Sequence, residues 1–227
     1  FNVFPNRILL VHNHYRQTGG EDRVFASESA LLERSGHRVI CFTADNSSIT
    51  GPGDLRLAAR TVWNGAARAG LGELLRDAQP EVVHLHNTFP LLSPSVHYAA
   101  KQHGAAVVQS LHNYRLLCPG ANLFRDGQVC EECLRSPAPW RGALHACYRD
   151  NRGASAAAAA MLAVHRVLGT WIRRVDLFVA LTGFARRKFI EAGFPAERIT
   201  VKPNFVDPDP GRGAGGGGYA LFVGRLS

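Results

Sequence analysis

The chain has 227 residues, of which 46% are hydrophobic and 19% are charged. This composition excludes a disordered chain, a collagen-like repeat and a disulfide-dense miniprotein. The length corresponds to one large domain, or to one domain with a piece of another. The formal net charge of +8 comes almost entirely from arginine, because the only lysines are Lys101, Lys188 and Lys202. An arginine excess suits contacts to phosphate or carboxylate, and it also arises from codon bias alone.

The first 45 residues predict a strand, a helix and a second strand. Residues 7–12 are a short apolar run, residues 24–35 have amphipathic helical spacing that Gly36 ends, and residues 37–44 are a second apolar run. Parallel strands need such a crossover helix. Cys41 lies in the second strand, where we expect a buried thiol.

The same alternation continues along the chain. Residues 54–78 are helical in composition, with breaks expected at Gly65, Gly70 and Gly72. Further strands are predicted at 81–86, 105–112, 176–181, 199–203 and 219–223, and further helices at 93–104, 155–175 and 183–192. Ser93 and Thr182 are the expected caps of two of these helices. The helix at 155–175 has an apolar stripe made of Met161, Val164, Leu168, Trp171 and Val175.

The predicted strands are continuous apolar runs rather than alternating ones. This pattern is typical of a parallel sheet covered by helices on both faces. The fold class predicted is therefore α/β, a doubly wound, Rossmann-like parallel sheet. Residues 209–218, rich in glycine and proline, predict a linker before the last strand.

Polar side chains stand where the predicted strands end. Ligands of such sheets bind at the carboxyl ends of the strands, so we expect these residues to line one polar cleft. A single histidine in such a place is more often a loop-stabilising residue, but three of the six ends begin with His followed by Asn. The ends are His12-Asn13-His14, Ala44-Asp45, His86-Asn87, His112-Asn113, Thr182 and Asn204.

Gly19 and Gly20 precede the first helix. Glycines there let a ligand approach the backbone closely, and the first turn of a helix offers free N–H groups to a phosphate. The spacing matches neither the dinucleotide fingerprint nor a Walker A loop. A phosphate cradle and a plain turn both remain open.

Several stretches together resemble the family 4 glycosyltransferases, which have the two-domain GT-B fold. They are RILLVHNHYRQTGGEDRVFASESALLERSGHRV, EVVHLHN, SLHNYRLLCP, ALTGFARRKFIEAGFPAERITVKPNFVD and YALFVGRLS. The resemblance implies an N-terminal acceptor-side domain at 1–208 with a cysteine-rich insertion at about 113–152. It makes 209–218 the linker and 219–227 the first strand of the donor-binding domain. Because the family's donor-holding glutamates come after that strand, we expect the 227-residue chain alone to be inactive.

The resemblance also implies the reaction and its residues. A sugar would pass from a nucleotide-diphosphate donor to an acceptor hydroxyl, with retention and without a catalytic metal or other cofactor. His112 matches the family histidine that faces the donor sugar, and Arg225 matches the arginine that contacts the diphosphate. The Gly19-Gly20 turn at the start of the helix would also bind the diphosphate. The candidates for the acceptor pocket are His14, Tyr15, Arg16, Glu21, Asn87, Asn113 and Tyr114. Asn204 falls where the family has an Asn-Gly-Val-Asp turn, although Phe205 replaces the glycine. The acceptor itself, whether a sugar, a lipid-linked molecule or a small molecule, is left open.

Four cysteines stand in the irregular segment at 113–152, spaced C-x11-C-x2-C-x13-C. They are Cys118, Cys130, Cys133 and Cys147. Four thiols with one C-x-x-C predict a structural zinc site, with His145 as a substitute ligand, while free or redox-active thiols and disulfides remain alternatives.

The basic clusters at 173–174 and 186–188 lie beside apolar helix residues. They are typical of an ordinary solvated helix face, and peripheral contact with an anionic membrane is the alternative. No secretory signal is evident, and the most apolar long stretch carries His165 and Arg166, so we expect a cytoplasmic protein. The family resemblance adds the expectation of a bacterial source.

Two other functions compete with the transferase. A metal-dependent hydrolase would use His12, His14, His84, His86 and His112, but no carboxylate accompanies them in the sequence motifs. A nucleic-acid-binding module would explain the net charge, but the chain lacks a recognition-helix motif and an RNA-binding sheet signature, so we expect no nucleic-acid partner.

Overall fold

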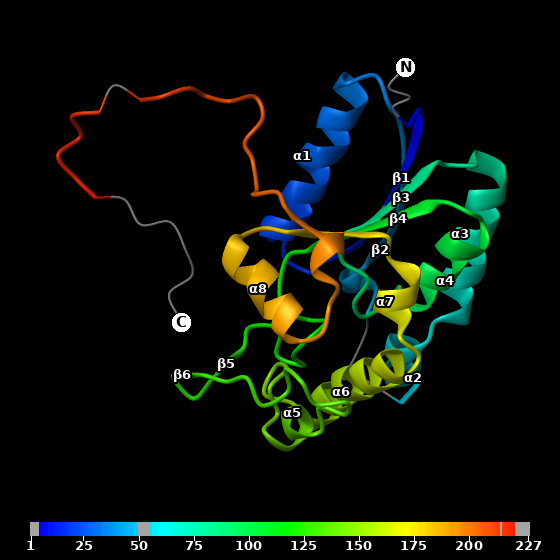
Figure 1. The fold of residues 1–227 in the computed structure, drawn as a ribbon, viewed down its shortest axis with the longest axis vertical. Coiled ribbons are helices and arrows are strands. Elements are labelled where there is room, and N and C mark those ends of the chain that lie inside the picture. Colours follow the sequence, from blue (N-terminus) through cyan, green and yellow to red (C-terminus); the bar gives the residue numbers. More distant parts are fainter. Residues whose placement is uncertain (1–4, 50–54, 214, 221–227) are drawn as a thin grey trace.

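The structure is a computed structural model that describes residues 5–49, 55–213 and 215–220. Its centre is a six-stranded sheet in the order β2-β1-β3-β4-β7-β8, and all neighbouring strands run parallel (Figure 1). The strands are β1 (Arg7–His14), β2 (Arg38–Asp45), β3 (Val82–Leu85), β4 (Ala106–Leu111), β7 (Leu177–Ala180) and β8 (Ile199–Val201). The predicted parallel α/β sheet is confirmed, and six predicted strands are present within about two residues of their expected bounds.

Helices cover both faces of the sheet, which makes it doubly wound. Alternate residues of β1 show why: Leu9 and Val11 join the main core, whereas Ile8 and Leu10 pack with Phe25 of α1 in a smaller cluster on the other face. Figure 1 shows α1 on one side of the sheet and α3 and α4 on the other. The helices are α1 (Gly20–Arg34), α2 (Leu55–Val62), α3 (Gly65–Ala78), α4 (Ser95–Gln102), α5 (Arg141–Leu144), α6 (Arg152–Val167), α7 (Thr170–Arg174) and α8 (Gly183–Glu191), with 3-10 turns η1 (Asn46–Ser48) and η2 (Ala196–Arg198).

The long helix predicted at 155–175 is wrong in one respect, because it is two helices. Gly169 adopts a left-handed φ of 61°, which separates α6 from α7. The predicted stripe is only partly buried: Met161 is 2% and Trp171 is 3% exposed, but Val164 is 38% and Leu168 is 43% exposed. The segment predicted to be helical at 54–78 likewise forms two helices, α2 and α3. They are separated before Gly65, because the Asn64 side chain accepts the Ala67 N–H and caps α3.

Two smaller expectations also need correction. Cys41 is exposed rather than buried, because β2 is an edge strand whose side chains are only partly covered. Ser93 does not cap α4 as predicted; Pro94 occupies the cap position, and Ser93 has a φ of 58°. The Thr182 hydroxyl accepts the Ala185 N–H and does cap α8.

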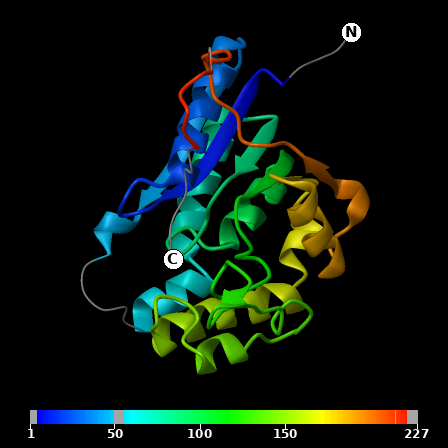
Figure 2. The same cartoon turned by 90° about the vertical axis from the view of Figure 1, so that its left-hand side faces the viewer.

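The segment that holds four of the cysteines is mostly irregular, as the sequence predicts. It contains only the short hairpin of β5 (Phe124–Arg125) and β6 (Gln128–Val129) and the four-residue helix α5. Because it follows β4 directly, it packs beyond the carboxyl edge of the sheet together with α6 (Figures 1 and 2). We call residues 113–152 the cysteine insertion.

The strand order reverses at β1, because β2 lies on one side of it and β3 on the other. Doubly wound sheets bind ligands at this reversal, in the crevice outside the carboxyl ends of the strands. The segment after β8 returns across α1: Lys202 pairs with Glu28, and Arg34 pairs with Asp207. Residues 202–213 and 215–220 form no helix or strand. The predicted strand at 219–223 lies mostly outside the described residues.

Candidate functional site

A cluster of histidines occupies the point where the strand order reverses. His12 and His14 end β1, His86 follows β3, and His112 follows β4. The ring centroids of His12 and His86 lie 6.1 Å apart, and those of His86 and His112 lie 5.2 Å apart. The predicted convergence of three strand ends is therefore present, and it lies under the N-terminal half of α1.

Asp22 joins the start of α1 to the end of β1. Its Oδ1 lies 3.0 Å from His12 Nε2 and 3.1 Å from His14 Nδ1, and it also accepts the Tyr15 N–H at 3.3 Å. Its Oδ2 accepts the Gly19 N–H at 2.7 Å, which is one of the two hydrogen bonds of a capping box; Gly19 has no side chain to make the other. The Gly19-Gly20 turn is thus held rigidly by a carboxylate of the protein itself. A side chain at Gly20 would meet nothing within 4 Å, so the backbone at Gly20 faces open space.

Glu21 connects the loops that follow β1 and β4. Its Oε2 accepts a hydrogen bond from the Tyr15 hydroxyl at 2.9 Å, and its Oε1 accepts one from Asn113 Nδ2 at 2.7 Å. Glu21, Asn113 and His112 line the same small cavity. Of the residues predicted for the acceptor pocket, Glu21, His14, Tyr15 and Asn113 therefore lie together.

Other predicted site residues lie apart or have structural partners. Asn87 lines the same small cavity, but its side chain is buried and donates to the Asn13 carbonyl at 2.8 Å. Tyr114 stacks on Phe189 of α8, with ring centroids 6.1 Å apart. Asn204 is exposed beyond β8. The predicted diphosphate contact, Arg225, lies outside the described residues.

A second carboxylate of α1, Glu28, reaches His84 of β3 and His86, which follows that strand. Its Oε1 lies 3.4 Å from His84 Nδ1, its Oε2 lies 3.9 Å from His86 Nε2, and Lys202 Nζ donates to Oε2 at 3.1 Å. The other ring nitrogens are also engaged: His84 Nε2 lies 2.9 Å from Ser110 Oγ, and His86 Nδ1 lies 3.0 Å from His112 Nε2. The result is a continuous polar chain from β8, through α1 and β3, to the end of β4.

Burial keeps these histidines neutral near pH 7. Desolvation lowers the pKa of His84 to about 3 and the pKa of His112 to about 4, and it holds the pKa of His86 well below its ordinary value. Desolvation also lowers the pKa of His12. Burial opposes ionisation of Asp22, but hydrogen bonds from Gly19, His12, Tyr15 and His14 outweigh it and hold the Asp22 pKa below its ordinary value. A neutral imidazole at His112 can hydrogen-bond a ligand without bringing a charge.

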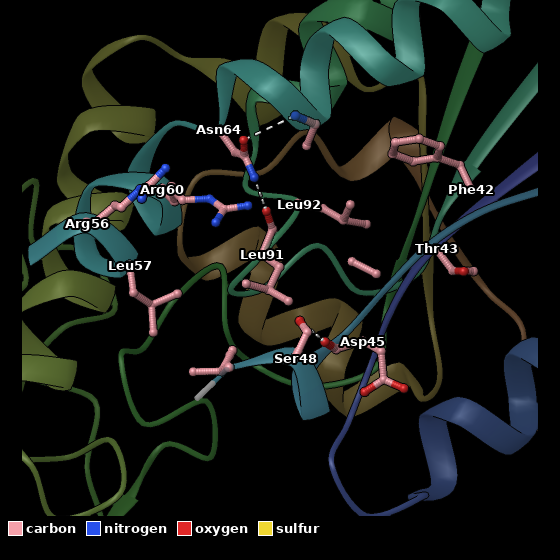
Figure 3. A pocket seen from close by; sticks show the side chains of 13 residues that line it. Phe42, Thr43, Asp45, Ser48, Arg56, Leu57, Arg60, Asn64, Leu91 and Leu92 are labelled. Atoms are coloured by element: carbon pink, nitrogen blue, oxygen red, sulfur yellow. Dashed lines mark hydrogen bonds between the residues drawn. The ribbon is translucent and has the colours of Figure 1, made fainter. Parts of the chain in front are cut away.

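Several cavities open near the carboxyl edge of the sheet, among them one at the histidine cluster and one at the end of β2. The smaller, about 30 Å³, lies against His86 and His112 and has room for about one water molecule. The larger, about 570 Å³, lies between the end of β2 and α2. Figure 3 shows Arg56 and Arg60 on one of its walls, Phe42, Thr43 and Asp45 on the other, and Leu91 and Leu92 between them. The sequence did not indicate this mixed apolar and cationic pocket.

In the part of the chain that the structure describes, two sets of side chains bring possible metal ligands within 4.8 Å of one another: His12 with His14 and Asp22, and Glu28 with His84 and His86. The first set is already joined by hydrogen bonds to Asp22, and the second already contains a cation, the ammonium of Lys202. Both carboxylates come from α1, so the expectation that no carboxylate accompanies the histidines is wrong. Internal hydrogen bonds and an ion pair account for both sets without a metal.

The thiols of the cysteine insertion influence one another. Burial, together with the neighbouring Cys118, Cys147 and Cys130 thiols, raises the pKa of Cys133 to about 11. Cys118 and Cys133 are both buried. Among the described residues, the four cysteines are not one of the sets with ligand atoms within 4.8 Å. A zinc ion would therefore require the thiols to lie closer together than they do here.

Comparison with known families decides the relationship of this chain. A model of Glycosyltransferase Family 4 matches residues 18–210, which is most of the chain. The chain belongs to this family. No curated protein gives a significant match. Within the described ranges, no helix has the length and the apolar character needed to cross a bilayer.

Several solved structures are similar in fold. Anabaena Alr3699/HepE in complex with UDP is 16% identical, with 88% of this chain and 44% of that chain covered and a TM-score of 0.45. UDP-N-acetylglucosamine 2-epimerase from Rickettsia bellii is 15% identical, with 88% and 45% covered and a TM-score of 0.48. The lipopolysaccharide outer core galactosyltransferase WaaB, in its apo form, is 13% identical, with 90% and 47% covered and a TM-score of 0.48. The chain spans less than half the length of these three proteins.

The sequence interpretation missed Asp22 and Glu28. The signal was available, because both lie on the face of α1 that carries Phe25 and Leu32, at helical spacing. A carboxylate on the buried stripe of a helix needs a partner, and the histidines at the strand ends are the polar groups that this face meets.

Proposed function

We propose that this chain forms the acceptor-side half of a glycosyltransferase that moves a sugar from a nucleotide-diphosphate donor to an acceptor hydroxyl, with retention at the anomeric carbon. The match to the family over residues 18–210 carries the proposal. The polar cluster at the reversal of strand order supports it, because this is where a doubly wound sheet offers a ligand site.

In this proposal, His112 orients the donor sugar. The residue lines the cavity beside Glu21, and its neutral ring can hydrogen-bond a hydroxyl group. As the bond to the leaving group breaks, negative charge grows on the diphosphate, which needs preorganised hydrogen-bond donors. The first-turn N–H groups of α1 beyond Gly19 have no partner inside the helix, so the Gly19-Gly20 turn can supply them. Arg225, outside the described residues, would add a cation.

The acceptor would enter beside Glu21, whose carboxylate holds Tyr15 and Asn113 in place. No catalytic metal is invoked, and we expect the 227-residue chain by itself to transfer no sugar. The larger pocket under Arg56 and Arg60 adjoins this edge of the sheet through Asp45, which pairs with His14 in the register of β1 and β2.

The test is an assay of the protein in its longest natural form with UDP-glucose, UDP-N-acetylglucosamine and GDP-mannose. Released nucleoside diphosphate and labelled product are measured, and the anomeric configuration of the product is read by NMR. His112→Ala should lower kcat/KM by about 10- to 100-fold, the cost of one hydrogen bond to the transition state. His103→Ala, at an exposed position after α4, is the matched control. Absence of turnover with every nucleotide sugar would refute the proposal.

One observation favours the hydrolase alternative, namely that carboxylates accompany the histidines. Both carboxylates are engaged, however: Asp22 by four hydrogen bonds and Glu28 by Lys202. Hydrolysis of a phosphoester that depends on an added divalent metal, without sugar transfer, would support that alternative.

Two further parts of the proposal concern binding rather than catalysis. We propose that the four thiols of the cysteine insertion hold a structural zinc ion, because a segment with so little regular structure needs a cross-link.

We propose that the basic clusters at 173–174 and 186–188 are solvated helix faces rather than a membrane-binding surface. Lys188 pairs with Glu131 and Glu191, and Arg186 donates to the Ile199 and Ala196 carbonyls.

A further inference from the structure

The hydrogen bond between His86 and His112 links two buried imidazoles. His86 Nδ1 lies 3.0 Å from His112 Nε2. Desolvation lowers the pKa of both residues, so both rings are neutral near pH 7. A neutral imidazole carries one N–H, and a hydrogen bond needs one donor and one acceptor. The proton between the rings therefore belongs either to His86 or to His112, and that choice decides what the other nitrogen of His112 offers.

The environment of His86 Nε2 makes this choice. This nitrogen is buried and has no hydrogen-bond partner in the described part of the chain. The polar atom that faces it is Glu28 Oε2, at 3.9 Å. A bare ring nitrogen carries a lone pair, which the carboxylate would repel, whereas an N–H dipole pointing toward the carboxylate is attracted. The geometry thus favours the proton of His86 on Nε2.

Glu28 has two further polar neighbours. Lys202 Nζ donates to Oε2 at 3.1 Å, and His84 Nδ1 lies 3.4 Å from Oε1. A buried carboxylate needs a cation nearby, and the Lys202 ammonium supplies one for Glu28. Ser110 Oγ, 2.9 Å from His84 Nε2, fixes the ring of His84 on its other side.

From these contacts we infer that Glu28 and His86 are positioning residues that fix the tautomer of His112. With the His86 proton on Nε2, its Nδ1 is an acceptor, so His112 must donate from Nε2. His112 Nδ1 then carries a lone pair and makes no hydrogen bond within the described residues, while the ring lines the small cavity. The site is therefore built to accept a hydrogen bond from a hydroxyl group of a ligand. That the ligand is a donor sugar rests on the proposed function; the tautomer does not.

The experiment is NMR of the chain labelled with ¹⁵N in histidine, at neutral pH, without nucleotide or sugar. Two-bond ¹H–¹⁵N correlations identify the protonated nitrogen of each ring, and coupling across the hydrogen bond identifies the pair. His112→Gln assigns the His112 signals. We expect the shared proton on His112 Nε2 and the other proton of the pair on His86 Nε2. A shared proton on His86 Nδ1, with His112 Nε2 bare, would overturn the inference whatever the variants show.

Variants test whether Glu28 is the cause. In Glu28→Met, the charge nearest His86 Nε2 becomes the Lys202 ammonium, which favours a lone pair there, so the protons of both rings should move to Nδ1 or divide between the two forms. Asp22→Asn is the matched control, because Asp22 is an equally buried carboxylate of α1 that contacts His12 and His14 instead. It should leave the His112 signals unchanged. An unchanged tautomer in Glu28→Met would refute the role of Glu28. The NMR experiment contains no substrate, so a result that overturns the tautomer does not bear on the transfer assay. Failure of the transfer assay likewise does not bear on the tautomer of His112.

Discussion

Replacing Asp22 by alanine should destabilise the fold, because one side chain there satisfies four groups. Its two oxygens accept from the Gly19 and Tyr15 N–H groups and lie 3.0 and 3.1 Å from the rings of His12 and His14. Loss of the capping contact costs about 1 kcal/mol. The His12 ring is fully buried, so a ring nitrogen left without a partner costs about 1–3 kcal/mol more.

The expected loss in the free energy of unfolding is therefore about 2–4 kcal/mol for Asp22→Ala. For a chain of this size that corresponds to a fall in Tm of roughly 4–16 °C. Asp22→Asn keeps one oxygen to accept the Gly19 N–H, so its loss should be smaller, about 1 kcal/mol. Urea unfolding followed by circular dichroism measures the loss, with an unchanged m-value as the check that two states are compared.

The pH dependence gives an independent readout. The folded protein holds the Asp22 pKa below its ordinary value, so the contribution of this carboxylate is present above about pH 4 and disappears as the pH falls through the lowered value. The difference in the free energy of unfolding between wild type and Asp22→Ala should accordingly become smaller below about pH 4. Burial of neutral His12 weakens the fold as the pH falls, but this affects both proteins in the same direction. A loss below about 0.5 kcal/mol, or a gap that stays constant into acid, would refute the reasoning.

Three further predictions test other parts of the molecule. Gly142→Ala should destabilise by about 1–3 kcal/mol, because its new Cβ would lie 2.6 Å from Pro119 Cγ, whereas Gly65→Ala, with nothing within 4 Å, should be neutral or stabilising in the same melting assay. Protein purified without chelator should contain one zinc per chain by elemental analysis, and replacing either cysteine of the C-x-x-C pair by serine should abolish it; metal-free wild type would contradict the zinc proposal. In liposome sedimentation, anionic and neutral vesicles should retain equally little protein, and a clear preference for anionic lipid would restore the membrane alternative.

Much of the fold could be predicted because local patterns encode it. The apolar runs became strands of a parallel sheet, and Thr182 caps α8 as its position suggested. The errors arose where local pattern and tertiary context differ. The stripe from Met161 to Val175 has helical periodicity throughout, but Gly169 takes a left-handed conformation that a periodicity argument does not detect. Cys41 has apolar neighbours in sequence, but its exposure depends on β2 being the edge of the sheet.

The sequence by itself determined the fold class, the family and the strand ends where polar residues gather, since each depends on residue type and spacing along one segment. Only the tertiary structure decided how those residues are connected. Asp22 and Glu28 are 10 and 56 residues from His12 and His84 along the chain, yet α1 lies across the sheet and brings each carboxylate within 3.4 Å of its histidine. Lys202 reaches Glu28 from the far edge of the sheet. Such contacts follow from how a helix crosses its strands, and no pattern within a single segment specifies that crossing.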